Sequence, residues 1–317
     1  MDALLAGREI VPETVAAFGS GAPYKVFRVN HKHADLARWQ NEPRLRRTSP
    51  ITLFMLEAAH QALGDDQRID RQRLGIVAAF GTGAMIATRR FYEGVIKSGP
   101  RFASPNVFPE TVFNSPTSHV ASVLGVAGPC YSILGDESAW VNAVGVAGTW
   151  LASGLVEHAL VIGAEEFDPI ILDAYARVRW VRRTGRFIPS EGAGAMLLRL
   201  AQPSDQRCVL AICEGHPYGN PREARRAAAE CLAEFPGEKR VHASAQCNWF
   251  APIERELQQA HGWITPPPLP YCGDAFTASA AWNTVRAASL AGRSGSRLLQ
   301  PVWGLNEQCS ALLLGAK

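Results

Sequence analysis

Apolar residues recur along the chain in two patterns, one typical of helices and one typical of buried strands. Between residues 51 and 63 they stand three or four positions apart, with Pro50 before them and Gly64 after them, which predicts a helix. The uninterrupted apolar run of residues 74–80 is followed by glycines and predicts a buried strand. A second helix is expected to begin near residue 116.

Short apolar runs and small-residue segments alternate through the middle of the chain. Residues 131–134, 159–163 and 192–198 are predicted strands, and residues 138–154, rich in Ala, Val and Gly, are a predicted helix. Uncharged strands that alternate with helices are typical of sheets covered by helices on both faces. The pattern therefore predicts an α/β protein.

The polar stretch of residues 201–207 is the best internal boundary. We expect two units, residues 1–200 and residues 207–317. The second unit is expected to repeat the order strand, helix, strand, small-residue helix, strand. Its last elements are predicted as a helix over 279–290 and a strand over 310–314.

The composition agrees with a large buried core. The chain has 317 residues, of which 47% are hydrophobic and 19% charged, with a formal net charge of +3. That charge is too small to imply a general attraction to nucleic acid. The high apolar content has two explanations that remain open: a large core alone, or a core together with a surface that a partner covers.

Neither the N-terminus nor any internal run suggests a membrane location. The first nine residues carry charge where a secretion signal needs an apolar stretch, and no run approaches the ~18 apolar residues of a membrane span. We therefore expect a cytoplasmic protein. Its seven scattered cysteines contain no C-x-x-C motif, which predicts reduced thiols rather than a disulfide framework or a zinc knuckle.

Two motifs that suggest a cofactor or a metal are incomplete. The glycines at 81 and 83 follow a predicted strand, but the dinucleotide fingerprint needs a third glycine where Ile86 stands. His31 and His33 offer two imidazoles, and no neighbouring cluster completes a metal site. We expect neither a cofactor nor a metal.

A basic run surrounds Trp180. It is either a solvated face or a contact for an acidic partner. The run comprises Arg177, Arg179, Arg182, Arg183 and Arg186.

The segment 128–140 has the frame of an active site. Gly128-Pro129 leads into a predicted strand, Gly135 breaks that strand, and a helix of small residues follows. Such a junction presents a side chain at a helix N-terminus, where free N–H groups and the helix dipole favour an anion. The side chain there is that of Glu137, a poor acyl acceptor, rather than a reactive thiol.

Several stretches in their order and spacing resemble β-ketoacyl synthases of the thiolase fold over nearly the whole chain. They are residues 70–83, 105–114, 128–133, 159–165 and 190–195. The resemblance implies a thiolase-like α/β fold of two similar halves in five layers (α-β-α-β-α). It also implies a dimer formed through the sheet beside the nucleophile strand.

The catalytic positions implied by this resemblance are all replaced. Family enzymes use one cysteine and two histidines, and the cysteine position falls on Glu137. The first histidine position falls on Ser244, with His242 two residues earlier, and the second falls on Asp274. A chain without the thiol cannot form an acyl-enzyme, so we expect no catalytic residue of the family type here.

The resemblance then implies a chain length factor, a non-catalytic subunit that pairs with an active β-ketoacyl-ACP synthase in polyketide or polyene biosynthesis. The expected partners are that synthase and an acyl carrier protein, and the arginine run is the candidate contact for the carrier. Phe113, Thr117 and Tyr131 are candidates for the wall of the acyl tunnel at the interface, the alternative being ordinary packing. The short chain and the glutamate at 137 suggest a compact branch, such as aryl-polyene systems.

Two further hypotheses remain. The chain could be an acyltransferase or hydrolase on the same scaffold, with Glu137 and Asp274 as a new acid–base pair and Cys130, His242 and Cys272 as other candidates. Alternatively, it could be a scaffold that binds acyl carrier protein through its arginine run.

Overall fold

The computed structural model describes residues 10–30, 32, 34–177, 187–245, 250–266, 272–305 and 308–317. Within these residues the strands form a two-stranded, a four-stranded and a three-stranded sheet. The larger sheets organise the core, and the small hairpin of β1 (Glu13–Ala16) and β2 (Pro23–Val26) lies outside them.

The four-stranded sheet has the order β4-β3-β5-β6. Its central strands, β3 (Leu74–Phe80) and β5 (His158–Glu165), run parallel and are buried almost throughout, which explains their uncharged sequences. The edge strand β4 (Cys130–Leu134) is parallel to β3, whereas β6 (Gly192–Leu198) is antiparallel to β5.

The three-stranded sheet is antiparallel and has the order β7-β9-β8. It is formed by β7 (Cys208–Pro217), β8 (Leu298–Trp303) and β9 (Gln308–Gly315). The strands β8 and β9 follow each other directly, and Gly304 and Leu305 begin the connection between them.

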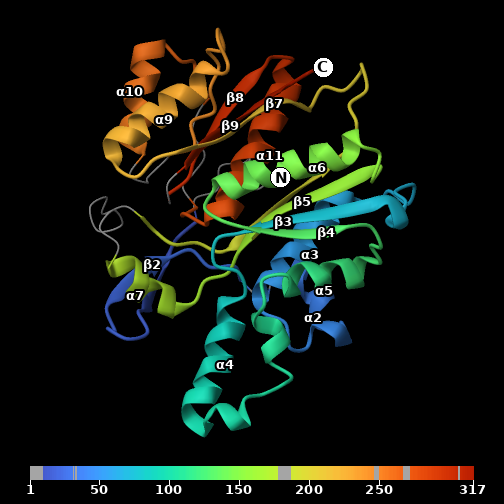
Figure 1. Ribbon diagram of the computed structural model, residues 1–317, viewed down its shortest axis with the longest axis vertical. Coiled ribbons are helices and arrows are strands. Elements are labelled where there is room, and N and C mark those ends of the chain that lie inside the picture. The colour runs from blue at the N-terminus through green and yellow to red at the C-terminus, as the bar shows by residue number, and fades with distance from the viewer. Residues whose placement is uncertain are drawn as a thin grey trace.

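Helices separate and cover the two sheets, so that the molecule has five layers (Figure 1). Between the sheets lie α6 (Ser138–Ala152) and α11 (Phe276–Ser294). The outer helices on the first sheet are α3 (Pro50–Leu63) and α5 (Ser115–Leu124), and those on the second are α9 (Pro221–Ala233) and α10 (Ala251–His261). The other α-helices in the described part of the chain are α2 (Ala34–Gln40), α4 (Met85–Ser98) and α7 (Pro169–Arg177).

The small residues of the middle layer permit close packing between two sheets. A side chain at Gly163 of β5 would overlap the carbonyl oxygen of Thr277, so α11 lies directly on the strand. The indole N–H of Trp140 donates to Thr284 Oγ1 at 2.8 Å and joins α6 to α11. Ala-rich helices are therefore required here, because larger side chains would force the layers apart.

The five-layer α/β architecture expected from the sequence is confirmed, and one predicted element is wrong. A strand was expected between the first two helices of the second unit. Arg240 and Val241 instead form only isolated bridges, to Ile264 and Leu299, and the additional strand is β8, after α11. The apolar run there is too short to continue a ladder, whereas β8 supplies six buried residues.

No helix in the described part of the chain combines the length and apolar character needed to cross a bilayer.

Candidate functional site

The site lies where β4 leads into α6. The strand ends at Leu134, and the N–H of Gly135 donates to the carbonyl of Phe80 at 3.0 Å. The chain then turns, and Glu137 occupies the position before the first residue of α6. Its side chain is buried, with 6% exposed, at the start of a helix that lies between the two sheets.

The carboxyl of Glu137 accepts hydrogen bonds from its own backbone N–H and from one other segment. The N–H of Leu305, in the β8–β9 connection, donates to its Oε2 at 2.9 Å. Burial raises the pKa of Glu137 well above its usual value, and the nearby carboxylates of Asp136 and Asp274 raise it further. The site therefore favours a protonated carboxyl at position 137.

The neighbouring Asp136 fixes the loop that contacts Glu137. Its Oδ1 accepts from the N–H of Ser138 and from Nε2 of Gln308, both at 3.0 Å. Any side chain at Gly304 would overlap the Asp136 carboxylate, and Tyr218 donates its hydroxyl hydrogen to the Gly304 carbonyl. Glycine at 304 thus allows the connection to lie against the start of α6.

Asp274 approaches the same region from the segment before α11. Its N–H donates to the carbonyl of Ile188 at 2.8 Å, and its carbonyl accepts from the N–H of Ser190 at 3.1 Å. These main-chain bonds fix the residue beside Glu137, whose pKa it raises by charge repulsion. The structure therefore brings together two of the three positions that match the family's catalytic residues.

Aromatic rings pack around the two acids. Tyr175 of α7 lies 5.2 Å from Phe187 and 5.7 Å from Phe276 between ring centroids. Burial raises the pKa of Tyr175 well above its usual value, with contributions from Glu165, Glu137 and Asp274. Phe276 has φ 38°, a left-handed backbone that costs a bulky residue about 1–3 kcal/mol and is found at functional sites.

The third matched position has a structural role. Ser244 donates its hydroxyl hydrogen to the carbonyl of Pro301 at 2.7 Å and its N–H to Glu254 at 3.0 Å. The alternative at this position, His242, is buried against α11, where burial above all, and also the charge of Arg286, lowers its pKa to about 3. An imidazole with so low a pKa is neutral and a weak base at neutral pH.

The two candidate cysteines are not activated. Cys130 lies on β4 and is exposed as a residue. Partial loss of solvent around its thiol nevertheless raises the pKa of that thiol. Burial, and then repulsion from Asp274, raise the pKa of Cys272 to about 11. A reactive thiol needs a lowered pKa, so neither is a nucleophile of the type that acyl transfer requires.

The three tunnel candidates lie on or near the β4 edge of the first sheet. Thr117 is buried and its hydroxyl bonds that of Ser132 on β4 at 2.8 Å. Tyr131 is 55% exposed and Phe113 46% exposed, and Phe113 packs over Gly83. Their role in a tunnel stays a prediction.

Only the first member of the arginine run is described. Arg177 is exposed at the end of α7. The other four, Arg179, Arg182, Arg183 and Arg186, lie outside the described residues.

The sequence interpretation missed two buried acids at the end of β5. Glu165 accepts from the N–H groups of Gly81 and Thr82, and from the hydroxyls of Thr82 and Thr277. Burial raises its pKa to about 7. Two consecutive glutamates directly after an apolar strand were the available signal, because acids at that place must find buried donors.

Glu166 ties the same strand end to two helices. It accepts from the hydroxyl of Ser49 at 2.7 Å, from the N–H of Ile51 at 3.1 Å and from the N–H of Ile86 at 2.6 Å. Burial raises its pKa to about 7. These bonds fix the first turns of α3 and α4. Both carboxylate oxygens of Glu166 accept hydrogen bonds from the protein itself, which indicates a structural role.

The architecture and the strand-to-helix site define a thiolase-like α/β protein. A family model described as "Beta-ketoacyl synthase, N-terminal domain" matches residues 14–203, more than half of the chain. The chain belongs to the β-ketoacyl synthase family.

Individual relatives agree with this family. The chain is 24% identical over 285 residues to 3-oxoacyl-[acyl-carrier-protein] synthase 2 of Coxiella burnetii, a match that covers 83% of this chain and 68% of that protein. The structure of the ishigamide ketosynthase/chain length factor is similar with a TM-score of 0.79, 17% identity and coverage of 99% of this chain and 93% of that one. A ketosynthase (ApeO) in complex with its chain length factor (ApeC) from Xenorhabdus doucetiae gives a TM-score of 0.71, 13% identity and coverage of 100% and 93%. At these identities the solved structures show a shared fold.

Proposed function

We propose that this protein is a chain length factor, a non-catalytic subunit that pairs with an active β-ketoacyl-ACP synthase and shapes the acyl tunnel at their interface. The observation that carries the proposal is Glu137. A buried carboxyl bonded to the N–H of Leu305 stands where the family's nucleophile belongs, and no activated thiol is described near it.

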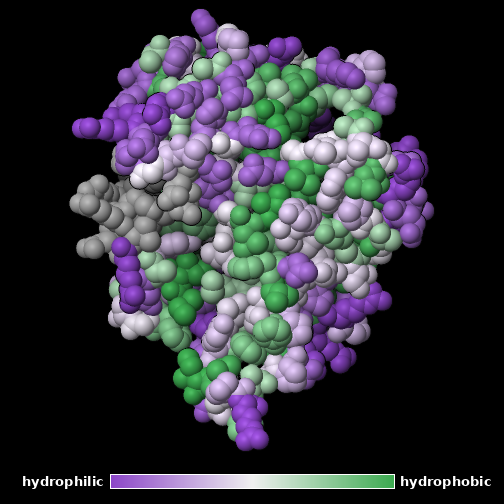
Figure 2. Space-filling view, viewed as in Figure 1, coloured by the Kyte–Doolittle hydropathy of each residue, from purple (hydrophilic) through white to green (hydrophobic). Residues whose placement is uncertain are grey.

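The β4 edge is the surface that supports pairing. Among the described strands only β3 pairs with β4, so its outer edge offers main-chain hydrogen-bonding groups. Tyr131 and Leu134 on this strand are 55% and 45% exposed. Figure 2 shows hydrophobic residues gathered over the middle of the face on which Figure 1 places β4 and α6.

A hollow beside this edge supports the same proposal. It has a volume of about 620 Å³ and is lined by residues of β4, α6 and β7, Tyr131 and Trp150 among them. An exposed strand edge, large apolar side chains and an adjoining hollow together are typical of a surface that a folded partner covers.

Co-purification tests the pairing. The chain is co-expressed with a tagged β-ketoacyl-ACP synthase that carries the intact cysteine and histidines, and the expected product is a one-to-one heterodimer. The double variant Tyr131→Arg/Leu134→Arg should weaken that heterodimer at least about 100-fold, because two charges would be buried at the interface. The matched control is Leu200→Arg, at a residue that is 58% exposed after β6. Equal binding by the edge variant and the control would overturn the proposal.

The tunnel role has its own readout. In the reconstituted heterodimer, Phe113→Ala and Thr117→Gly should lengthen the principal product, because removing bulk from the tunnel wall extends the space for the chain. Unchanged product length in both variants, with pairing retained, would leave the subunit as a partner and remove the tunnel role from these residues.

One observation favours a second candidate, an acyltransferase or hydrolase. Glu137, with its raised pKa, lies beside Asp274, and two acids in different environments can serve as acid and base. The chain alone would then cleave an acyl-carrier-protein thioester, and Glu137→Gln would abolish the cleavage. Since the amide keeps the bond to Leu305, this variant separates chemistry from folding.

Contact with the acyl carrier protein belongs to the same proposal. Reversing Arg177 and its four neighbouring arginines to glutamate should lower the affinity of the heterodimer for the acidic carrier while product length stays unchanged.

A further inference from the structure

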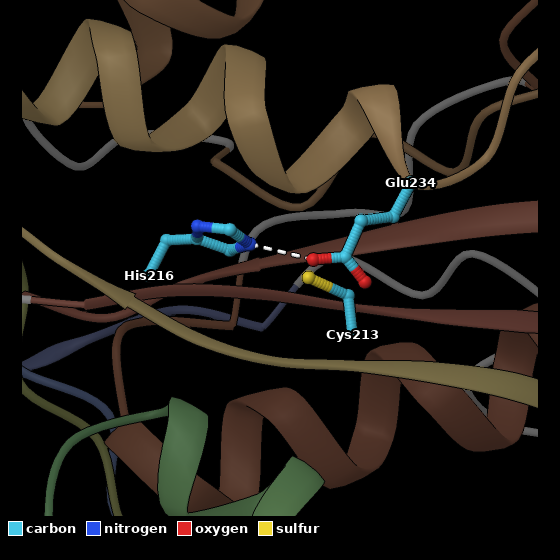
Figure 3. A group of neighbouring side chains, drawn as sticks. All are labelled: Cys213, His216 and Glu234. Carbon is cyan, nitrogen blue, oxygen red and sulfur yellow. Dashed lines mark hydrogen bonds and ion pairs between the residues drawn. The ribbon is translucent and has the colours of Figure 1, made fainter.

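A cluster of metal-ligating side chains lies far from the Glu137 site in the chain, where β7 meets α9. Cys213 and His216 belong to β7, and Glu234 directly follows the last turn of α9. One ligand atom of each, the thiol sulfur, an imidazole nitrogen and a carboxylate oxygen, lies within 4.8 Å of the other two. Figure 3 shows the imidazole and the carboxylate pointing toward each other, with the sulfur beside them.

A bulge in β7 creates this juxtaposition. In a regular strand, residues three apart point to opposite faces of the sheet. The register between β7 and β9 shifts between Cys213 and His216, so both side chains turn toward α9. Gly215 stands within the bulge, where any side chain would overlap the amide of Gln308. The local backbone is thus shaped so that the thiol and the imidazole converge.

The surroundings of the cluster match those of a metal-binding histidine. Nε2 of His216 lies 2.7 Å from Glu234 Oε1, and its Nδ1 lies 3.7 Å from Glu230 Oε2. A carboxylate on the far nitrogen of an imidazole orients the ring toward a metal. Cys213 is buried, whereas His216 and Glu234 are partly exposed, which provides an entry path for an ion.

The three side chains that could bind a metal determine which ion the cluster prefers. A thiolate, an imidazole and a carboxylate suit zinc, with sulfur and nitrogen ligands in a tetrahedron, and a hard cation would avoid the sulfur. A fourth ligand is at hand, since the thiol of Cys231 on α9 is hydrogen-bonded to that of Cys213.

We propose that Cys213, His216 and Glu234 bind one zinc ion that joins the bulge of β7 to the end of α9. Binding replaces the hydrogen bond between His216 and Glu234 and releases the thiol proton of Cys213 to solvent. The ion stabilises the outer layer of the second sheet and takes no part in pairing through β4 or in the tunnel.

Cobalt provides the probe, because thiolate-bound Co²⁺ has a charge-transfer absorption in the near ultraviolet. The full chain is stripped with a chelator, kept in a non-thiol reductant and titrated with Co²⁺, then with Zn²⁺ in competition. The expected result is one Co²⁺ per chain with that absorption, its displacement by one equivalent of Zn²⁺, and a melting temperature raised by a few degrees.

The variants separate ligation from folding. The double variant Cys213→Ala/Cys231→Ala should abolish the charge-transfer absorption, since it removes both thiols of the cluster. His216→Gln should weaken binding at least about 100-fold, while its amide keeps a hydrogen bond to Glu234 at this partly exposed site. Cys208→Ala is the matched control, a buried thiol on the same strand that bonds the carbonyl of Asp205 instead, and it should bind as the wild type does. Absence of the absorption in the folded wild type, or its persistence in Cys213→Ala/Cys231→Ala, would overturn the proposal.

Discussion

Glu137 and Glu166 are both buried glutamates beyond the end of a strand, and the structure holds them in different ways. Glu166 accepts three hydrogen bonds, from Ser49, Ile51 and Ile86. For Glu137 the described donors are the N–H of Leu305 and its own N–H, and two acids lie close by. Burial raises the pKa of both residues. Three donors from other segments oppose that effect at Glu166, whereas at Glu137 only one donor comes from another segment and two neighbouring acids raise the pKa further.

The difference separates a structural acid from one placed at a former catalytic position. Glu166 satisfies groups that have no other acceptor, so its carboxylate is part of the fold. Glu137 has little support as an anion, and its environment favours the neutral acid. Removing the carboxyl should therefore cost much stability at Glu166 and little at Glu137.

The largest effect is expected for Glu166→Ala. The change leaves two buried N–H groups, those of Ile51 and Ile86, and one hydroxyl without their acceptor. At roughly 1–3 kcal/mol for each of the three unsatisfied groups, the free energy of unfolding should fall by about 3–9 kcal/mol. Urea unfolding followed by circular dichroism measures it. The control is Glu157→Ala, which removes an exposed ion pair with Arg73 and should cost less than about 1 kcal/mol. A similar loss in both variants would contradict the structural role of Glu166.

The two acids at the end of β5 should make the free energy of unfolding fall as the pH rises. The pKa values of Glu165 and Glu166 rise from 4.5 to about 7 on folding, so between these pH values the folded chain holds protons that the unfolded chain has released. Stability is therefore full below about pH 4.5, falls as the pH rises through 7 and then levels off. Each carboxyl contributes up to about 3 kcal/mol to the fall.

Urea unfolding at pH 5, 6, 7 and 8 checks this direction. Glu166→Gln serves as the matched variant, since it should lose its own share of the fall while keeping an acceptor oxygen at position 166. A stability that rises from pH 5 to 8 in the wild type would show that these acids are ionised in the folded chain at pH 5.

Long periodic segments were predicted well from the sequence. The predicted helix over 138–154 and strands over 159–163 and 192–198 correspond to α6, β5 and β6, because buried elements must be apolar along their whole length. Helix α4 was missed because it is polar on average, with charged residues such as Arg89, Arg90 and Glu93 between its apolar ones, and only its Ala87 is buried. Strand β8 was missed because its run includes Gln300 and Pro301, which tertiary packing tolerates.

The site was predictable only in part. The strand-to-helix frame around Glu137 follows from local spacing, and a nucleophile position without a thiol can be seen in the sequence alone. The bond from Leu305 joins positions 168 residues apart, which no local pattern indicates. The spacing of Cys213 and His216 was also visible, but in a regular strand it places the side chains on opposite faces, and the bulge that reverses this has no sequence signature of its own.

A smaller loss of stability is expected when the loop that holds Glu137 is displaced. In Gly304→Ala, the added methyl group would overlap the carboxylate of Asp136, so the connection must shift away from α6. The cost is about 1–3 kcal/mol, as for other overpacked sites. Gly94→Ala, in α4 with open space around it, is the control and should be neutral or slightly stabilising. Equal stability of both variants would show that the loop does not depend on this contact.

The smallest change in stability is expected for Glu137→Gln. An amide resembles the protonated carboxyl and can still accept the N–H of Leu305, so at pH 6 the free energy of unfolding should change by less than about 1 kcal/mol. Above the raised pKa of Glu137 the variant should be the more stable protein, since the wild type must then bury a charge beside Asp136 and Asp274. Unfolding curves at pH 6 and at successively higher pH measure both effects, and Glu137→Ala, which leaves the Leu305 N–H unsatisfied, should lose about 1–3 kcal/mol at pH 6. If Gln were as destabilising as Ala at pH 6, Glu137 would be a structural acid whose carboxyl the fold requires, as it requires that of Glu166, and the contrast between the two would disappear.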